Sequence, residues 1–153
     1  MRIRSILSLA VSAVAAVALA TPAQAADDGS YLIRDARTGA CLAGEGLLGG
    51  HIELCSPDTV WGIRNQGDGL VRIVEPQAEG RCLALSPLRI YPPVVWVDEC
   101  GNSPDLWSIQ GREYEGRVAI ALDRGEFGSL ATQGSRVVVT HDGGPQWVLE
   151  RVG

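Results

Sequence analysis

Lysine is absent from the sequence, aromatic residues make up only 5% of it, and long apolar runs are missing after the N-terminal segment. The one apolar run, Ile6 to Ala20, is shorter than the roughly 20 residues that a membrane-spanning helix requires, which argues against a transmembrane anchor. After residue 25 the chain has 11 arginines against 18 acidic residues, a formal charge of −7. Nucleic acids and anionic membranes, which attract basic surfaces, are therefore poor partners.

Histidine is scarce as well, with two residues in the chain, and this scarcity argues against an enzyme. His141 is next to Asp142 in the sequence, whereas a Ser-His-Asp site brings the two together from separate segments. His51, Glu53 and Cys55 alternate onto one strand face, but a Cys55 held in a disulfide is no metal ligand, so no metal site is expected. No Gly-rich phosphate loop opens a helix, and no cofactor is expected.

The first 25 residues have the layout of a secretory signal peptide. Arg2 and Arg4 precede the apolar run, and Ala23-Gln24-Ala25 is an Ala-x-Ala cleavage site. We therefore expect cleavage after Ala25 and a secreted, extracellular protein that forms one domain over residues 26–153. In an oxidising compartment the four cysteines predict disulfide bonds. An all-arginine basic set with abundant alanine and glycine is typical of GC-rich bacterial genomes.

The chain after residue 25 repeats one pattern three times, at about 30–66, 67–112 and 113–153. Each copy runs from an extended apolar segment through a Gly-containing turn to a Cys-Leu-Ala step, a β-branched strand and a tryptophan, and the third copy has lost its cysteines. The tryptophans, Trp61, Trp107 and Trp147, are 46 and 40 residues apart. Four short β-branched runs in each copy predict twelve strands and an all-β domain. Propellers need about four or more blades, so three four-stranded repeats predict a β-trefoil with the tryptophans in a common core.

The first copy reads Ile33-Arg34-Asp35-Ala36-Arg37-Thr38-Gly39-Ala40-Cys41-Leu42, followed by a strand to Cys55 and then Trp61. This layout resembles a repeat of the ricin-B-type trefoil family, and the resemblance covers the whole chain after residue 25. It implies disulfides within repeats, Cys41 with Cys55 and Cys82 with Cys100, out of the three pairings that four cysteines allow. It places Ser129 and His141 at the equivalent positions of the third repeat.

In that family, by the same resemblance, a sugar is held by an Asp two residues after the first Cys, an aromatic residue two before the second, and an Asn and a Gln ahead of the Trp. Carboxylate and amide groups hydrogen-bond sugar hydroxyls, while the aromatic face covers the C–H surface of the ring. Other residue types occupy the four positions in all three repeats: Ala43, Ala84 and Ala131; Glu53, Asp98 and Val139; Asp58, Pro104 and Gly144; Thr59, Asp105 and Pro145. The usual sugar contacts are therefore expected to be lost.

Trp96 and Asp98 are the one aromatic and acidic pair that strand alternation places on a single face of the second repeat. They are the predicted contacts for a sugar if a carbohydrate site exists elsewhere on the surface. The alternative is that Trp96 belongs to the core or the rim of the barrel.

The second repeat has an unusual loop before its β-branched strand, Ser86-Pro87-Leu88-Arg89-Ile90-Tyr91-Pro92-Pro93. Its prolines predict a stiff, extended backbone, and a Cys82–Cys100 bridge would pin its base. Arg, Tyr and bulky apolar residues are the usual interface anchors, and a stiff loop lowers the ordering cost of binding a protein. The alternative is that Leu88, Ile90 and Tyr91 fold back over the end of the barrel.

The segment from Leu88 to Pro93 resembles the reactive loop of substrate-like serine protease inhibitors, with a basic residue, a β-branched residue after it and prolines behind. Kunitz-type inhibitors of the soybean class are β-trefoils that present such an Arg-Ile bond, on a different hairpin. The resemblance implies that Arg89 enters the acidic pocket of a secreted protein with a trypsin-like fold. The predicted function is non-enzymatic protein recognition, as an inhibitor or as an adaptor in a secreted complex such as a toxin particle. The alternative is a ricin-B-like lectin that binds an extracellular glycan.

Overall fold

The computed structural model describes residues 26–44, 46, 49–75, 77–111 and 116–153, and the predicted signal peptide of residues 1–25 lies outside them. The described residues form twelve β-strands and two short 3-10 helices, which confirms the all-β prediction. In chain order the strands are β1 Gly29–Asp35, β2 Cys41–Ala43, β3 His51–Glu53, β4 Val60–Gly67, β5 Leu70–Val74, β6 Arg81–Leu85, β7 Val95–Glu99, β8 Trp107–Gly111, β9 Val118–Leu122, β10 Ser129–Gln133, β11 Arg136–Thr140 and β12 Trp147–Arg151. The 3-10 helices are η1 Pro57–Thr59 and η2 Asp123–Gly125. Neither helix is long and apolar enough to cross a membrane.

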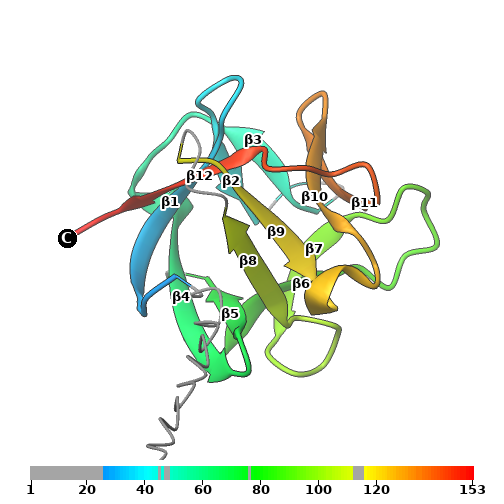
Figure 1. Ribbon diagram of the computed structural model, residues 1–153, viewed down its shortest axis with the longest axis horizontal. Helices are drawn as coiled ribbons and strands as arrows, with labels where there is room; N and C mark the ends of the chain where they lie inside the picture. The colour runs from blue at the N-terminus through cyan, green and yellow to red at the C-terminus, as the bar shows by residue number, and fades with distance from the viewer. Residues whose placement is uncertain (1–25, 45, 47–48, 76, 112–115) are drawn as a thin grey trace, which may run out of the picture.

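Six of the strands close a barrel. β1 pairs with β4 and β12, β5 with β4 and β8, and β9 with β8 and β12, all in antiparallel fashion. The other six form three hairpins, β2–β3, β6–β7 and β10–β11. Each consecutive set of four strands therefore contributes two barrel strands and one hairpin (Figure 1). This arrangement is the predicted β-trefoil of three four-stranded repeats.

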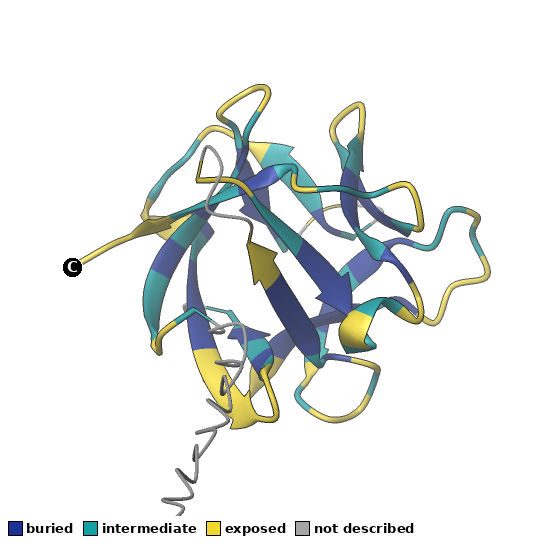
Figure 2. Cartoon of the chain, in the orientation of Figure 1, coloured by how far each residue is buried: buried dark blue, intermediate teal, exposed yellow. Residues whose placement is uncertain are grey.

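The centre of the trefoil is apolar, and buried segments line the barrel strands in Figure 2. Trp61, Trp107 and Trp147 are 2%, 0% and 0% exposed and belong to one apolar cluster, which confirms the common core predicted from their spacing. Each indole N–H donates to a leucine carbonyl in the first strand of the hairpin of the same repeat, two strands earlier in the chain, at 2.8, 2.8 and 3.0 Å for Leu42, Leu83 and Leu130 respectively. The repeated Leu and Trp therefore fasten each hairpin to the last strand of its own repeat.

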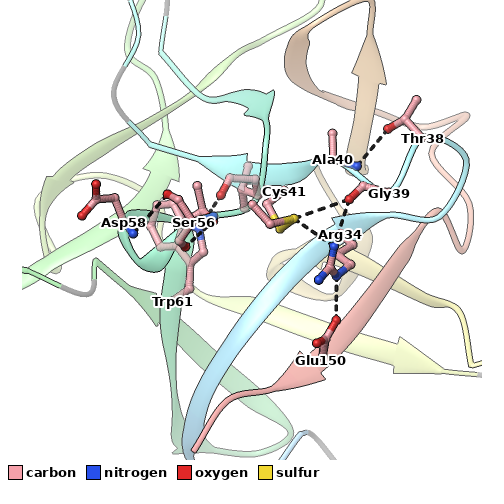
Figure 3. Close-up of a disulfide and its surroundings, with 12 residues drawn as sticks. Arg34, Thr38, Gly39, Ala40, Cys41, Ser56, Asp58, Trp61 and Glu150 are labelled. Atoms are coloured by element: carbon pink, nitrogen blue, oxygen red, sulfur yellow. Dashed lines mark hydrogen bonds and ion pairs between the residues drawn. A yellow bond between two sulfur atoms is a disulfide. The ribbon is translucent and has the colours of Figure 1, made fainter.

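Both disulfide bonds lie within a repeat. Cys41 is bonded to Cys55 and Cys82 to Cys100, as the resemblance implied. The first bridge is also tied to the end of the chain, because Arg34 donates to the Cys55 sulfur at 3.0 Å and to Glu150 at 2.7 Å (Figure 3).

Removal of either bridge is expected to lower the free energy of unfolding by about 3 kcal/mol, because the closed loop regains conformational freedom in the unfolded chain. The bonded cysteines are 14 and 18 residues apart. Urea unfolding of the variants Cys41→Ala/Cys55→Ala and Cys82→Ala/Cys100→Ala measures each contribution. An unchanged unfolding midpoint in both variants would contradict it.

Candidate functional site

A hollow of about 450 Å³ lies where the first repeat meets the second. It is lined by Ala43, Gly44, Glu53, Asp58, Trp61, Glu75, Gln77, Ala78 and Arg81. Ala43, Glu53 and Asp58 stand at three of the four positions where the family resemblance places sugar contacts. The fold therefore brings those positions of the first repeat together around a hollow, although their residue types differ from the family pattern.

Asp58 is positioned by η1, which begins with a capping box. Ser56 Oγ accepts a hydrogen bond from the Asp58 backbone N–H at 3.2 Å, and the Ser56 N–H donates to Thr59 Oγ1 at 3.0 Å. Proline at the first helical position suits this start, because its missing N–H would have had no partner there. Figure 3 shows Ser56, Asp58 and Trp61 on one side of Cys41. A disulfide and a buried tryptophan thus fix the first wall of the hollow.

The second wall comes from the turn between β5 and β6. Gln77 Nε2 donates to Asp58 Oδ1 at 2.6 Å and so links the two repeats across the hollow. Arg81 Nε lies 3.6 Å from Glu75 Oε2, an oxygen that is shielded from solvent. On the first wall, His51 Nε2 lies 3.0 Å from an oxygen of Glu53.

The lining is predominantly acidic. Glu53, Asp58 and Glu75 contribute three carboxylates against the single guanidinium of Arg81, an excess of two negative charges. Carboxylates only accept hydrogen bonds, whereas amide and guanidinium groups donate them, so the hollow offers both kinds of partner to a hydroxyl-rich ligand. Trp61 offers no stacking face, because it is 2% exposed.

The sequence pattern does not identify Glu75, Gln77 and Arg81 as site residues. They belong to the second repeat and come next to the first-repeat residues only in the folded trefoil. The sequence signal that could have pointed to Glu75 is its position directly after the β-branched run that forms β5, at the start of the turn that lines the hollow. The equivalent residue in the first repeat is Asp35, the last residue of β1, as the matching pairs Arg34–Cys41 and Val74–Cys82 show.

Trp96 and Asp98 are half-buried on one face of β7, as strand alternation predicts. Asp98 Oδ1 accepts from the Glu99 N–H at 2.8 Å, and Oδ2 accepts from Asn102 and Ser103 at 2.9 and 2.7 Å. The indole N–H of Trp96 is shielded from solvent and has no acceptor among the described residues. Asp98 thus organises the turn after β7, and a sugar contact at this pair stays a prediction.

The hydrogen bond from Ser103 is the largest of the causes that hold the pKa of Asp98 below its ordinary value of 3.8. Because folding lowers the pKa of Asp98, its ionised carboxylate stabilises the folded state at pH values above the unfolded-state pKa. This contribution to stability is lost as the pH falls through the folded-state pKa. Ser103→Ala is expected to raise the pKa of Asp98, whereas Ser135→Ala on a distant exposed turn leaves it unchanged. Carboxyl-carbon NMR titration compares the two variants, and an unmoved Asp98 pKa in Ser103→Ala would contradict the assignment.

The loop Ser86–Pro93 contains no strand and extends away from the barrel between β6 and β7, at the right of Figure 1. Leu88 is 53% exposed and Tyr91 is 94% exposed, so neither folds back over the end of the barrel. That alternative is wrong for these two residues. Arg89 is exposed as well, whereas Ile90 is half-buried.

The Cys82–Cys100 bridge does not pin the base of this loop, contrary to expectation. The bridge joins one end of the β6–β7 hairpin, and the loop leaves from Leu85 at the other end. Three residues of strand, about 10 Å at the usual rise, separate the bridge from the loop. The base is held instead by the Ser86 N–H, which donates to the Val94 carbonyl at 2.9 Å.

Cys82, Cys100 and Asp105 place ligand-type atoms within 4.8 Å of one another. The two sulfurs are joined as a disulfide and are not thiolates, which are the form that binds metal. Asp105 is 3% exposed, and its Oδ2 lies 3.2 Å from Arg72 Nε. The cluster is thus a disulfide beside an ion pair.

No protein-family model matches the chain, and no curated protein matches it in sequence. Solved structures match it in fold. A mosquitocidal holotoxin aligns with a TM-score of 0.70 at 18% identity, over 87% of this chain and 17% of the toxin chain. SeviL bound to the asialo-GM1 saccharide aligns at 0.64 and 16% identity, over 83% of this chain and 100% of SeviL. The designed threefold-symmetric protein ThreeFoil aligns at 0.66 and 17% identity, over 82% of this chain and 100% of ThreeFoil. The fold shared with these structures is the β-trefoil.

Proposed function

We propose that the protein is a secreted, non-enzymatic carbohydrate-binding protein that holds a sugar in the hollow between its first two repeats. The observation that carries the proposal is a hollow of about 450 Å³ at the positions where the family resemblance places sugar contacts. The likeness in fold to SeviL, which was solved with a saccharide, supports it. The two disulfides support export, since such bonds persist in oxidising compartments.

The chemistry of the lining suggests which sugars this hollow prefers. Carboxylates of Glu53 and Asp58 accept hydrogen bonds from sugar hydroxyls, while Gln77 donates to sugar oxygens. The excess negative charge repels an acid group placed among these carboxylates. We therefore expect this hollow to bind neutral or amine-bearing saccharides better than acidic ones.

A glycan array tests the proposal when it is probed with the wild type and with Ala78→Trp, which places a bulky side chain in the hollow. Ser135→Trp, on an exposed turn outside the lining, is the matched control. We expect the wild type and Ser135→Trp to bind the same glycans and Ala78→Trp to lose them. An array without any bound glycan, or one on which Ala78→Trp binds like the wild type, would overturn the proposal.

A second candidate function is protein recognition through the loop Ser86–Pro93, and the exposure of its side chains favours it. In this role Arg89 enters the acidic pocket of a trypsin-like fold, and Tyr91 adds apolar contact area. The protein is then an inhibitor, or an adaptor within a secreted complex such as a toxin particle if the partner lacks catalytic activity.

Arg89→Ala is expected to weaken binding to a trypsin-like partner at least about 30-fold, because a buried arginine anchor contributes roughly 2 kcal/mol or more. Surface plasmon resonance against trypsin measures binding directly, whether or not the protease is inhibited. Arg136→Ala on β11 removes the same charge outside the loop and should bind like the wild type. Equal affinity of wild type and Arg89→Ala would refute this role.

A further inference from the structure

Arg89 stands at the centre of a tight turn in the loop Ser86–Pro93. The Ile90 N–H donates to the Leu88 carbonyl at 2.9 Å, which closes a three-residue turn around Arg89. The Arg89 side chain is exposed, and no hydrogen bond or ion pair holds its guanidinium among the residues that the structure describes. A cationic group with N–H donors on three nitrogens is thus available to a partner.

Both ends of this loop are held by hydrogen bonds. Ser86 Oγ accepts from the Leu88 N–H at 3.2 Å, and Ser86 itself is 6% exposed. At the other end, the Pro93 carbonyl accepts from the Val139 N–H of β11 at 2.8 Å. Because these bonds order the loop before any contact forms, less conformational entropy is lost when it binds.

The hollow between the first two repeats has the opposite charge. Its three carboxylates exceed the guanidinium of Arg81 by two negative charges. Asp58 Oδ1 accepts from Gln77, and Glu53 Oε2 lies against His51. The second oxygen of each carboxylate, Asp58 Oδ2 and Glu53 Oε1, has no donor among the described residues. These oxygens are free to accept hydrogen bonds from an incoming guanidinium.

Exposed apolar side chains accompany both the loop and the hollow. Such large side chains in the described part of the chain are Leu54, Leu88, Tyr91, Phe127 and Val152. Leu88 and Tyr91 lie on either side of Arg89 in the loop. Leu54, which is 89% exposed, directly follows Glu53 of the hollow. Since an exposed ion pair alone contributes little, apolar contact beside it is needed for a stable association.

The loop and the hollow belong to opposite ends of β6. Arg81, the first residue of the strand, lines the hollow, and the loop begins after Leu85, the last residue. Four residue steps, about 13 Å at the usual rise, separate these ends. No residue of the loop, which the structure describes in full, lines the hollow. The loop extends away from the barrel (Figure 1), so it is placed to meet the hollow of another molecule.

We propose that the protein self-associates head to tail, with Arg89 of one copy in the hollow of the next. Arg89 donates hydrogen bonds to the carboxylates of Glu53 and Asp58. Leu88 and Tyr91 pack on the exposed leucine beside the hollow. The excess of acidic residues opposes the approach of two copies, but physiological salt screens this repulsion beyond about 8 Å.

The contact joins two different surfaces, so each pair of molecules keeps one unused loop and one unused hollow. Further copies can therefore add to the pair. The association needs neither a glycan nor a protease, and it does not depend on the proposed function.

Sedimentation equilibrium at physiological ionic strength, from micromolar to millimolar protein, tests the proposal. We expect the average mass of the wild type to rise with concentration. Arg89→Glu and Glu53→Gln/Asp58→Asn should each weaken the association at least about tenfold, because hydrogen bonds between charged groups are lost.

Two controls change the same charges elsewhere. Arg37→Glu, and Glu126→Gln combined with Asp142→Asn, alter exposed residues outside both the loop and the hollow. Both controls should associate as the wild type does.

A mixture of the two weakened variants is the sharpest test. Arg89→Glu keeps an intact hollow, and Glu53→Gln/Asp58→Asn keeps an intact loop. Mixed in equal amounts, they should form pairs that do not grow further. A wild type that stays monomeric, a mixture that forms no pairs, or variants that associate like the wild type would each overturn the proposal.

Ala78→Trp separates this inference from the proposed function, because it fills the hollow against either occupant. If Ala78→Trp loses glycans but associates like the wild type, the self-association is wrong and carbohydrate binding stands. If no glycan binds the wild type but Ala78→Trp loses association, carbohydrate binding is wrong and the self-association stands.

Discussion

Trp107→Ala is expected to lower the free energy of unfolding by about 4 kcal/mol, the range for truncating a large core side chain. Trp107 is 0% exposed and donates its indole N–H to the Leu83 carbonyl at 2.8 Å. The substitution leaves a cavity in the apolar core and a buried carbonyl without its partner. Because domains of this kind are stable by only about 5–15 kcal/mol, the loss is a large part of the total. Urea unfolding monitored by circular dichroism measures it.

Two variants identify the cause of that loss. Trp107→Phe keeps most of the volume and removes the N–H, so it should cost about 1–2 kcal/mol. Trp96→Ala removes an equal side chain from the half-buried face of β7 and should cost less than Trp107→Ala. Equal destabilisation by Trp96→Ala and Trp107→Ala would contradict the attribution of the Trp107→Ala loss to the full burial of its side chain and to its indole hydrogen bond.

Glu53→Gln combined with Asp58→Asn is expected to weaken sugar binding about 30-fold. Each carboxylate is proposed to accept a hydrogen bond from the sugar, and the amide that replaces it still accepts the bond but without the charge. Because bonds to charged groups contribute roughly 1.5–3 kcal/mol and neutral ones roughly 0.5–1.5 kcal/mol, the loss is about 1 kcal/mol at each position and about 2 kcal/mol in total. The replaced groups keep their shape, and both residues are exposed, so the fold should remain intact. Isothermal titration calorimetry with a glycan identified on the array gives the affinities.

Glu126→Gln is the control for charge, because Glu126 is exposed and lies outside the lining of the hollow. It should bind sugar as the wild type does. Unchanged affinity in the Glu53→Gln/Asp58→Asn variant, with its unfolding midpoint preserved, would show that the sugar does not contact this wall.

The core of this fold could be predicted from the sequence because it depends on residues that recur. In each of the three repeats the Leu and the Trp form the same buried hydrogen bond. The two disulfides join equivalent cysteines of the first and second repeats. Local alternation and equal spacing are enough to locate such contacts.

The candidate site was harder to predict because its two walls come from different repeats. Asp58 and Gln77 are 19 residues apart and meet through a hydrogen bond that only the closed trefoil creates. Comparison of residue types at the family positions therefore found the loss of the usual sugar contacts but not the polar groups that line the hollow in their place. The loop Ser86–Pro93 shows the same limit, since its predicted anchor, the Cys82–Cys100 bridge, lies at the other end of its hairpin.

The most direct test of carbohydrate binding in the first hollow is a two-dimensional ¹H–¹⁵N NMR titration of the wild-type protein with a glycan identified on the array. The resonances with the largest chemical-shift changes should be the backbone N–H groups of Gly44, Asp58 and Gln77 and the indole N–H of Trp61, because these four residues line the hollow. Shifts confined to the loop Ser86–Pro93 or to the β7 face of Trp96, with the residues of the hollow unmoved, would contradict the proposed site.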